Sequence, residues 1–271
     1  MKRAAALATA LALLAGCSRG NGPESAEPDI APPEITTETS PQPPIDLIGV
    51  WQADNSDDVL QLPGERPMLT PAGRKLADAR RVAAAHSDRS WDGTLRCMPP
   101  GVPRILGFGQ PFDINADAHL IVMGFQYQRL VRMIYMDDAY PIDPGPTWMG
   151  ESHGRWEGDT LVVETGNFVP GLALDGSGLP QSAATMLTER YEHIDEDTLI
   201  DYITVNDPEM YQKPWQAQVT LRRIAGLTVR EDVCTDRIAR ATAAAADVPA
   251  TAPSPSPLPG PPTAPQAPSP P

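Results

Sequence analysis

The chain has 271 residues and carries 35 acidic against 21 basic side chains, which gives a formal charge of −14. A protein of this charge repels phosphate backbones, which argues against nucleic-acid binding. The histidines show no metal-ligand spacing and no CxxC pair occurs, so the sequence predicts neither a metal site nor a cofactor. The four histidines are His86, His119, His153 and His193.

The first residues, MKRAAALATALALLAGC, have the features of a signal peptide. Lys2 and Arg3 form a basic start, and the apolar run 4–14 is too short to span a bilayer permanently. The segment ends in Leu-Ala-Gly-Cys, which resembles the bacterial lipobox and implies removal of residues 1–16 and acylation of Cys17. The alternative is an ordinary secretory signal that is cut nearby.

Lipid on Cys17 would anchor the mature chain to a membrane. Ser18 follows the lipid site, and by resemblance to Gram-negative lipoproteins a serine there implies sorting to the outer membrane, facing the periplasm. We therefore expect a protein of the bacterial cell envelope whose first partner is the membrane itself.

Two segments have the composition of disordered chain. Residues 17–44 are acidic, rich in Pro, Ser and Thr and poor in large apolar residues, so they predict a flexible tether. Residues 241–271 are rich in Ala, Pro and Ser, so they predict a disordered tail with polyproline II character. The tail is either plain solvated chain or a spacer that touches peptidoglycan or a partner. Residues 45–240 remain as one domain.

The domain opens with IDLIGVWQADNS, a predicted strand in which Gly49-x-Trp51 resembles the start of lipocalin-type barrels. A core tryptophan on any first strand fits equally well. One helix follows over 70–86, with Thr70 as N-cap and Pro71 at the first position. Its apolar stripe is narrow, and its arginines and lysine are expected to point outward. The stripe consists of Ala72, Leu76, Ala79 and Ala83, and the outward side chains are Arg74, Lys75, Arg80 and Arg81.

The remaining domain alternates β-rich runs with turns. The runs are HLIVMGF, QRLVRMIYM, SHGRWEGDTLVVETGNF, MLTERYEHIDEDTLIDYITVND, WQAQVTLRRI and LTVREDVC. No βαβ spacing occurs, and turn signals return about every 8–12 residues, as in all-β domains. The sequence therefore predicts a mainly β fold, an antiparallel meander that forms a lipocalin-like barrel or a sandwich, with one N-terminal helix. Cys97 and Cys234 form an even pair in an oxidising compartment and predict a disulfide; two buried thiols, or a nucleophilic cysteine, are the alternatives.

Four stretches resemble a family of uncharacterised bacterial exported proteins: CMPPGVPR (97–104), RMIYMDD (132–138), PTWMGESHGRWEGDTLVVET (146–165) and NDPEMYQKPW (206–215). The resemblance runs from Trp51 to Cys234. It implies export and the extent of the domain, and it implies no particular activity. Glu151 and Tyr140 stand where the family pattern has histidine, so no mechanism that rests on those two histidines carries over.

The densest polar pattern lies on two of these runs. Ser152 and His153 are neighbours on a strand and point to opposite faces, so they cannot act together as a serine nucleophile and its base. Tyr135 and Asp137 lie on the same face of one predicted strand. A second row of polar residues lies on one face of the next predicted strand. We expect these residues either to line an interior cavity or to form a solvent-facing row of ion pairs. The second row is Glu151, His153, Arg155 and Glu157.

If these residues line an interior cavity, they are candidates for a functional site. His153, Asp137 and Glu151 are the candidates for acid/base chemistry. Further candidates would contact a ligand: Arg132, Tyr135, Trp148, Arg155, Tyr211 and Trp215. The segment DPEMYQKPW, which holds the last two, is either a lid over a barrel mouth or a packed corner.

The leading interpretation is an envelope lipoprotein that binds a small apolar or amphipathic molecule inside the barrel. One alternative is an enzyme that performs hydration, isomerisation or cyclisation in the same cavity. The other is an envelope protein-interaction module, whose partners the sequence does not name.

Overall fold

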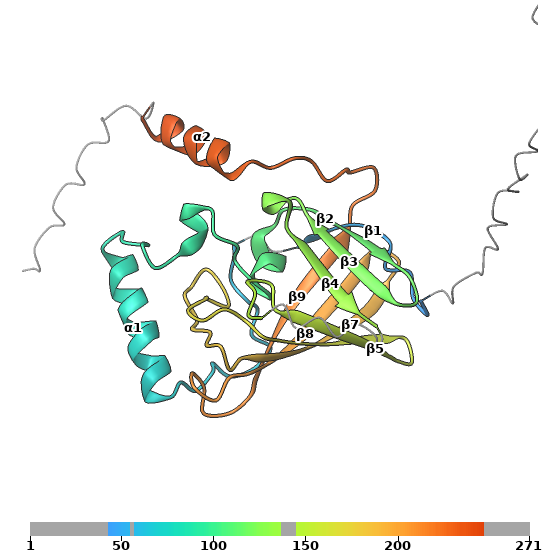
Figure 1. The fold of residues 1–271 in the computed structure, drawn as a ribbon, viewed down its shortest axis with the longest axis horizontal. Helices are drawn as coiled ribbons and strands as arrows, with labels where there is room; N and C mark the ends of the chain where they lie inside the picture. Colours follow the sequence, from blue (N-terminus) through green and yellow to red (C-terminus); the bar gives the residue numbers. More distant parts are fainter. Residues whose placement is uncertain (1–42, 55–56, 137–144, 247–271) are drawn as a thin grey trace, which may run out of the picture. The chain divides into compact units, whose positions relative to one another are not determined.

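The computed structural model describes residues 43–54, 57–136 and 145–246 (Figure 1). The signal peptide, Cys17, nearly all of the predicted tether and Asp137 lie outside these residues, as does the tail from 247 onward. Within the described residues, no helix is long and apolar enough to cross a membrane.

Nine strands form a closed barrel, which confirms the predicted mainly β, barrel-like fold (Figure 1). The strands are β1 (Gly49–Ala53), β2 (Phe112–Ala116), β3 (Leu120–Phe125), β4 (Val131–Tyr135), β5 (Glu151–Glu157), β6 (Thr160–Gly166), β7 (Met186–Asp195), β8 (Thr198–Asn206) and β9 (Trp215–Arg223). Three short 3₁₀ helices lie between them: η1 (Gly93–Arg96), η2 (Arg104–Phe108) and η3 (Tyr127–Arg129).

Each strand pairs with its sequence neighbour, and β1 closes the barrel against β9. All the pairs are antiparallel except one. β4 and β5 run parallel, with Ile134 opposite Ser152 and Tyr135 opposite His153, so the expected antiparallel succession is broken at this point. A parallel pair needs a crossover connection rather than a tight turn. By contrast, Gly158, at φ +64°, makes the tight turn between β5 and β6.

Burial alternates along the strands, as a barrel with one face inward requires. The interior rows hold mostly large apolar side chains. Trp51 is completely buried; its indole N–H donates to the carbonyl of Leu47 at 2.9 Å, and the guanidinium of Arg223 covers its ring at 4.6 Å. The first-strand tryptophan is therefore a core residue, as both interpretations of Gly-x-Trp require.

Helix α1 (Pro71–Ala85) begins as predicted, because the Thr70 hydroxyl accepts from the Gly73 amide at 3.0 Å. The buried face differs from the prediction. Gly73 and Arg80 are its buried residues, while Ala72 and Ala79 of the predicted stripe are exposed. The expected outward position of Arg80 is wrong, because its guanidinium donates to the carbonyls of residues 171, 172 and 178. A Cβ at Gly73 would meet the Met210 carbonyl, so glycine permits this close approach.

Helix α2 (Cys234–Ala246) is the second difference from the prediction. It includes residues 241–246, which composition had assigned to the disordered tail, and residues 227–233 before it are irregular rather than a strand. The predicted disulfide is confirmed, since Cys234, the first residue of α2, is bonded to Cys97. Arg237 adds an ion pair with Asp232 and lies 4.4 Å above the ring of Tyr127. The Ala-rich sequence has helix propensity, and these contacts add to it.

Candidate functional site

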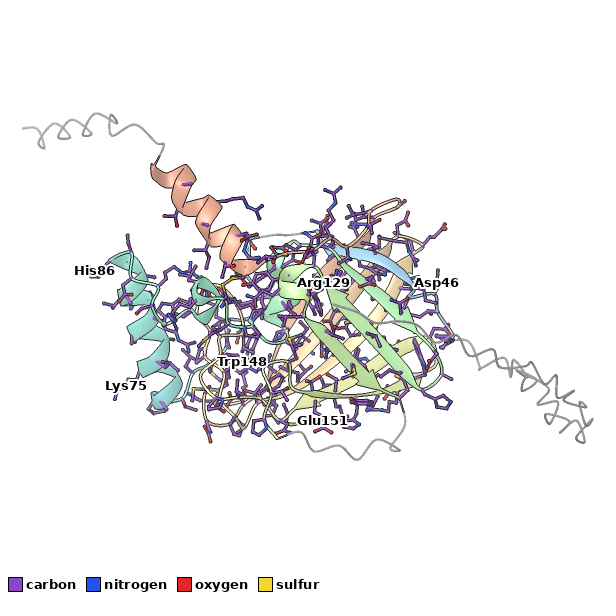
Figure 2. All side chains as sticks on the ribbon, turned by 45° about the horizontal axis from the view of Figure 1, so that its top comes forward. Asp46, Lys75, His86, Arg129, Trp148 and Glu151 are labelled. Atoms are coloured by element: carbon purple, nitrogen blue, oxygen red, sulfur yellow. A yellow bond between two sulfur atoms is a disulfide. The ribbon has the colours of Figure 1, made fainter. Side chains whose placement is uncertain are left out.

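The predicted catalytic row on β5 lies on the outer face of the barrel. The His153 side chain is 45% exposed and pairs with Glu151 at 3.1 Å, while Ser152 between them is buried in the interior. Figure 2 places Glu151 at the edge of the barrel. Of the two alternatives for this row, the interior one does not hold for His153 and Glu151, and Asp137, their predicted companion, lies outside the described residues.

The rest of this row forms surface ion pairs. Arg155 pairs with Glu164 on β6 at 2.9 Å and with Glu157 on its own strand at 3.0 Å, and Arg190 on β7 reaches Glu157 at 2.8 Å. This is the solvent-facing alternative that the parity of the strand left open. Such exposed pairs contribute little to stability. Tyr135 on β4 shares this outer face, with its ring 6.0 Å from that of His153.

The segment DPEMYQKPW (207–215) forms the packed corner that was one of its two predicted alternatives. Tyr211 and Trp215 are buried with ring centroids 5.3 Å apart, and the Tyr211 hydroxyl donates to the carbonyl of Pro180 at 2.9 Å. Burial raises the pKa of Tyr211 well above its usual value, and Asp207 adds to the shift. Trp148 lies instead among the loops outside the strands, where it is half-buried (Figure 2).

Two of the predicted ligand contacts point inward: Trp215, which shares the buried face of β9 with Ala217 and Val219, and Arg132, which is 2% exposed inside the barrel. The Arg132 side chain is at the centre of a polar cluster, the Arg132 network, whose members lie on β4, β5, β6 and β7. Nε donates to Ser152 Oγ at 3.1 Å, and Nη1 donates to Glu189 Oε1 at 2.9 Å and to the Tyr191 hydroxyl at 3.2 Å. Nη2 donates to Thr165 Oγ1 at 2.8 Å and also contacts Glu189.

This network is internally satisfied. A guanidinium has five N–H donors, and the contacts of Arg132 match all of them. Burial disfavours the charged guanidinium, but the Glu189 carboxylate outweighs burial and raises the pKa of Arg132. Because its members are all at most 2% exposed, the network presents no reactive atom to solvent. Its chemistry therefore favours a structural role in fastening the four strands β4 to β7 to one another.

Asp201 on β8 is the exception beside this network. It is completely buried opposite Tyr191, and neither of its carboxyl oxygens has a hydrogen-bond partner among the described residues. Burial raises the pKa of Asp201 well above its usual value, and the nearby Glu189 raises it further. The raised pKa favours the uncharged form of Asp201, in which Arg132 and Glu189 form a balanced pair of charges.

Sequence reasoning missed most of this interior. Glu189 and Tyr191 share the parity of Leu187, and Asp201 shares that of Leu199 and Ile203, which are all buried. A polar residue within an apolar row is a visible signal, and it would have directed attention to β7 and β8.

A second buried arginine lies outside the barrel. Arg104, 4% exposed, donates to both oxygens of Asp58 and to both oxygens of Asp92, at 2.6–3.1 Å. Burial opposes ionisation of Asp92, but hydrogen bonds from Arg104 and Thr94 prevail and lower its pKa. For Asp58, burial dominates and the pKa is raised. This cluster ties η2 to the loops beside α1.

Several hollows open among those loops, and two of them bear on function. The first, the α1 cleft, has a volume of about 430 Å³ and lies between α1 and segments 59–69 and 175–179. Its apolar walls are Val59, Leu60, Leu62, Pro67, Leu69, Ala77 and Leu179, and its charged rim is Arg66, Asp78 and Arg81. The second, the Trp91 pocket, has a volume of about 150 Å³, and Trp91 and Trp148 contribute to its walls.

Comparison with known proteins gives no relative: no protein-family model matches the sequence, and no curated protein is significantly similar to it. Within the described residues, no three His, Cys, Asp or Glu side chains gather in a way that could hold a metal ion. The geometry of the two hollows and of the barrel interior is therefore the basis for any functional assignment.

Proposed function

We propose that this protein is a lipid-anchored envelope protein that binds a small apolar or amphipathic molecule, and that the α1 cleft is the binding site. The observation that carries the proposal is the composition and size of this cleft. Small-molecule sites are concave, about 300–1,000 Å³ in volume, mostly apolar, and fitted with a few polar groups that orient the ligand. A cleft of about 430 Å³ with leucine walls and a charged rim meets these conditions.

The barrel interior is the less favourable location. Its largest side chains are completely or almost completely buried, among them Trp51, Phe112, Arg132 and Tyr191. A ligand there would have to displace packed side chains or break the Arg132 network, which would leave a buried charge without its partner. The α1 cleft is open to solvent and requires neither change.

The cleft favours an amphipathic ligand over a purely apolar one. Leu62, Leu69 and Leu179 offer a surface for a hydrocarbon or ring system, and Arg66 and Arg81 at the rim could meet an anionic group. Asp78 pairs with Arg81 at 3.1 Å on the exposed side of the helix. Because exposed ion pairs are weak, a ligand anion could compete for Arg81 at small cost.

The first test is native mass spectrometry of the chain extracted from membranes of its own host. A bound small molecule would appear as a reproducible added mass. The second test measures binding of 8-anilinonaphthalene-1-sulfonate, an anionic amphiphile, by its directly excited fluorescence. Ala77→Trp would fill the cleft from α1, and we expect it to weaken binding at least tenfold, about 1.4 kcal/mol.

The matched control is Ala79→Trp on the same helix. Ala79 is exposed and lies roughly 200° around the helix from Ala77, so its indole would point away from the cleft. This variant should bind the probe as the wild type does. The proposal is wrong if no host molecule is retained and both tryptophan variants bind the probe equally.

The anchor is tested separately. With Cys17→Ala, the lipobox loses its acceptor thiol, so we expect the protein to move from the membrane fraction to the soluble periplasmic fraction. The same fractionation of wild-type cells after labelling with a radioactive fatty acid should show label on the protein. Label retained by Cys17→Ala would contradict the assignment of Cys17.

A further inference from the structure

We propose that the Trp91 pocket is a docking site for the chain's own proline-rich segment 253–271, PSPSPLPGPPTAPQAPSPP, bound as a polyproline II helix. This site is distinct from the α1 cleft and does not depend on the ligand proposed for it. The inference rests on the aromatic and proline lining of the pocket, on its small volume, and on the covalent route that leads from its wall to the tail.

Part of the lining has the chemistry of a polyproline-binding surface, and polar side chains complete it: Asp92, Thr94, Arg96 and Arg104. Trp91 and Trp148 supply aromatic walls, and Pro99, Pro100 and Pro170 supply rigid apolar ones. Grooves of this kind recognise proline-rich chain because the extended helix is already formed and loses little entropy on binding. The pocket is therefore suited to proline-rich segments in general rather than to one particular side chain.

The ring of Trp91 lies against the guanidinium groups of two arginines, Arg80 and Arg89. The guanidinium of Arg80 lies 5.2 Å from the ring centroid, and that of Arg89 lies 5.3 Å from it. Trp91 Nε1 is covered and has no hydrogen-bond partner among the described residues. A buried donor without an acceptor costs about 1–3 kcal/mol. An acceptor brought to this N–H by a docked chain would remove that cost, and a prolyl residue carries a carbonyl acceptor but no N–H donor of its own.

The two segments that form the pocket are brought together by one glycine. Gly101 has φ +78°, and a Cβ there would lie 2.8 Å from the Trp148 carbonyl oxygen. Only glycine accepts this backbone angle and this close approach without strain. The segment 97–104 thereby lies directly against Trp148, and its prolines share the pocket with that indole.

The volume favours an extended chain over a free molecule. At about 150 Å³ the pocket is well below the 300–1,000 Å³ of typical small-molecule sites. One or two prolyl rings of a longer segment would occupy it, and the rest of the segment would continue over the surface.

The tail is covalently close to the pocket. Cys97 adjoins the pocket residue Met98, and its disulfide partner Cys234 begins α2, with the two Cα atoms 5.7 Å apart. The 13 residues of α2 carry the chain roughly 20 Å away. Six residues, 247–252, follow α2, and a chain of that length can reach at most roughly 20 Å, which is enough for the segment from Pro253 to return to the pocket. Tethering gives an effective concentration in the millimolar range, so even weak docking would be populated.

The test compares the Trp91 indole N–H resonance in the mature full chain and in a chain that ends at Ala246, with the assignment made from Trp91→Phe. We expect the resonance to differ between the two chains. Adding the synthetic peptide 253–271 to the truncated chain should shift the resonance back toward its position in the full chain. The same peptide with its prolines replaced by alanine should bind at least tenfold more weakly. Because the substitutions are in the peptide, the folded domain is the same in both measurements.

Three results would overturn the proposal. Identical Trp91 resonances in the full and truncated chains would show that the tail does not reach the pocket. Restoration by a peptide of residues 22–44, but not by 253–271, would assign the pocket to the N-terminal segment instead. A shift in the full chain that appears only as protein concentration rises would assign it to the tail of a second copy.

Discussion

Two buried arginines, Arg132 inside the barrel and Arg104 outside it, are neutralised in different ways. Arg132 binds one carboxylate, that of Glu189, and completes its hydrogen bonds with hydroxyl groups. Arg104 binds two carboxylates, those of Asp58 and Asp92, at the same time. Both arginines are less than 5% exposed, so burial alone does not explain the difference.

The contrast lies in access to water. Inside the barrel a second charged carboxylate would be costly, and Asp201 is held in its uncharged form by burial. Outside the barrel the Asp58 side chain is 25% exposed, so part of its charge remains solvated. For these two arginines, the second carboxylate partner occurs where one of the two carboxylates, Asp58, still reaches water. The following substitutions test this difference, from the largest expected effect to the smallest.

Replacing Arg132 should have the largest effect. Arg132→Met leaves Glu189 buried without a cation, and losing one partner of a buried pair costs about 3–5 kcal/mol. Urea titration of the free energy of unfolding measures this loss. The double variant Arg132→Met, Glu189→Leu removes the stranded charge and should recover much of the stability. If Arg132→Met lowers the free energy of unfolding by less than about 1 kcal/mol, the Arg132 network does not stabilise the barrel in the way proposed.

Replacing Arg104 should cost less, about 2 kcal/mol for the lost charge-assisted hydrogen bonds. Asp58 can still be hydrated, and Asp92 keeps its contacts with Arg89 and Thr94. The lowered pKa of Asp92 gives stability that is present above its unfolded pKa and is lost as pH falls through the folded pKa. In Arg104→Met that pKa rises, so acid unfolding should begin at a higher pH than in the wild type. Circular dichroism during acid titration checks this shift.

Asp201→Asn should increase stability at neutral pH. The pKa of Asp201 is raised, so its contribution to stability is fully present below the unfolded pKa and declines as pH rises, until the folded pKa is passed. The decline is at most about 1.4 kcal/mol per pH unit. Asparagine does not titrate. The difference in the free energy of unfolding between the variant and the wild type should therefore grow between about pH 5 and 8 in urea titrations. Asp58 also has a raised pKa, so the test is the difference between variant and wild type. A constant difference across this range would contradict the assignment.

Arg155→Ala should have the smallest effect. Arg155 forms two ion pairs, but all three side chains are about half exposed and solvated. We expect the free energy of unfolding to stay within the error of the titration, at low and at high salt. A loss as large as that of Arg104→Met would mean that the number of ion pairs, rather than access to water, sets their strength.

The fold was largely predictable because its signals are local. Runs of β-forming residues between turn signals identified most of the strands. Thr70 and Pro71 identified the start of α1, and the even cysteine pair predicted the disulfide. Each of these features depends on residues close in sequence or on the compartment alone. The parallel pairing of β4 and β5 was not predictable in this way, since it depends on the connection between them.

The candidate site was less predictable because orientation is a long-range property. Both faces of β5 carry polar residues, so parity alone could not show that Ser152, rather than His153, points inward. Arg80 is buried because carbonyls about 90 residues away accept its protons, and no local pattern contains that information. The two hollows likewise form between segments that are distant in sequence.

The junction between β4 and β5 also has a consequence for the motion of the barrel. The backbone register joins these strands only from Ile134–Ser152 to Tyr135–His153, whereas β7 and β8 stay paired from Met186–Asn206 to Asp195–Thr198. Arg132 spans the short junction through its bond to Ser152. Amide hydrogen exchange should therefore begin at β4 and β5, well before the long ladders of β6 to β9 exchange. The β4–β5 ladder is the shortest in the barrel, and the Arg132 side chain adds one hydrogen bond across it.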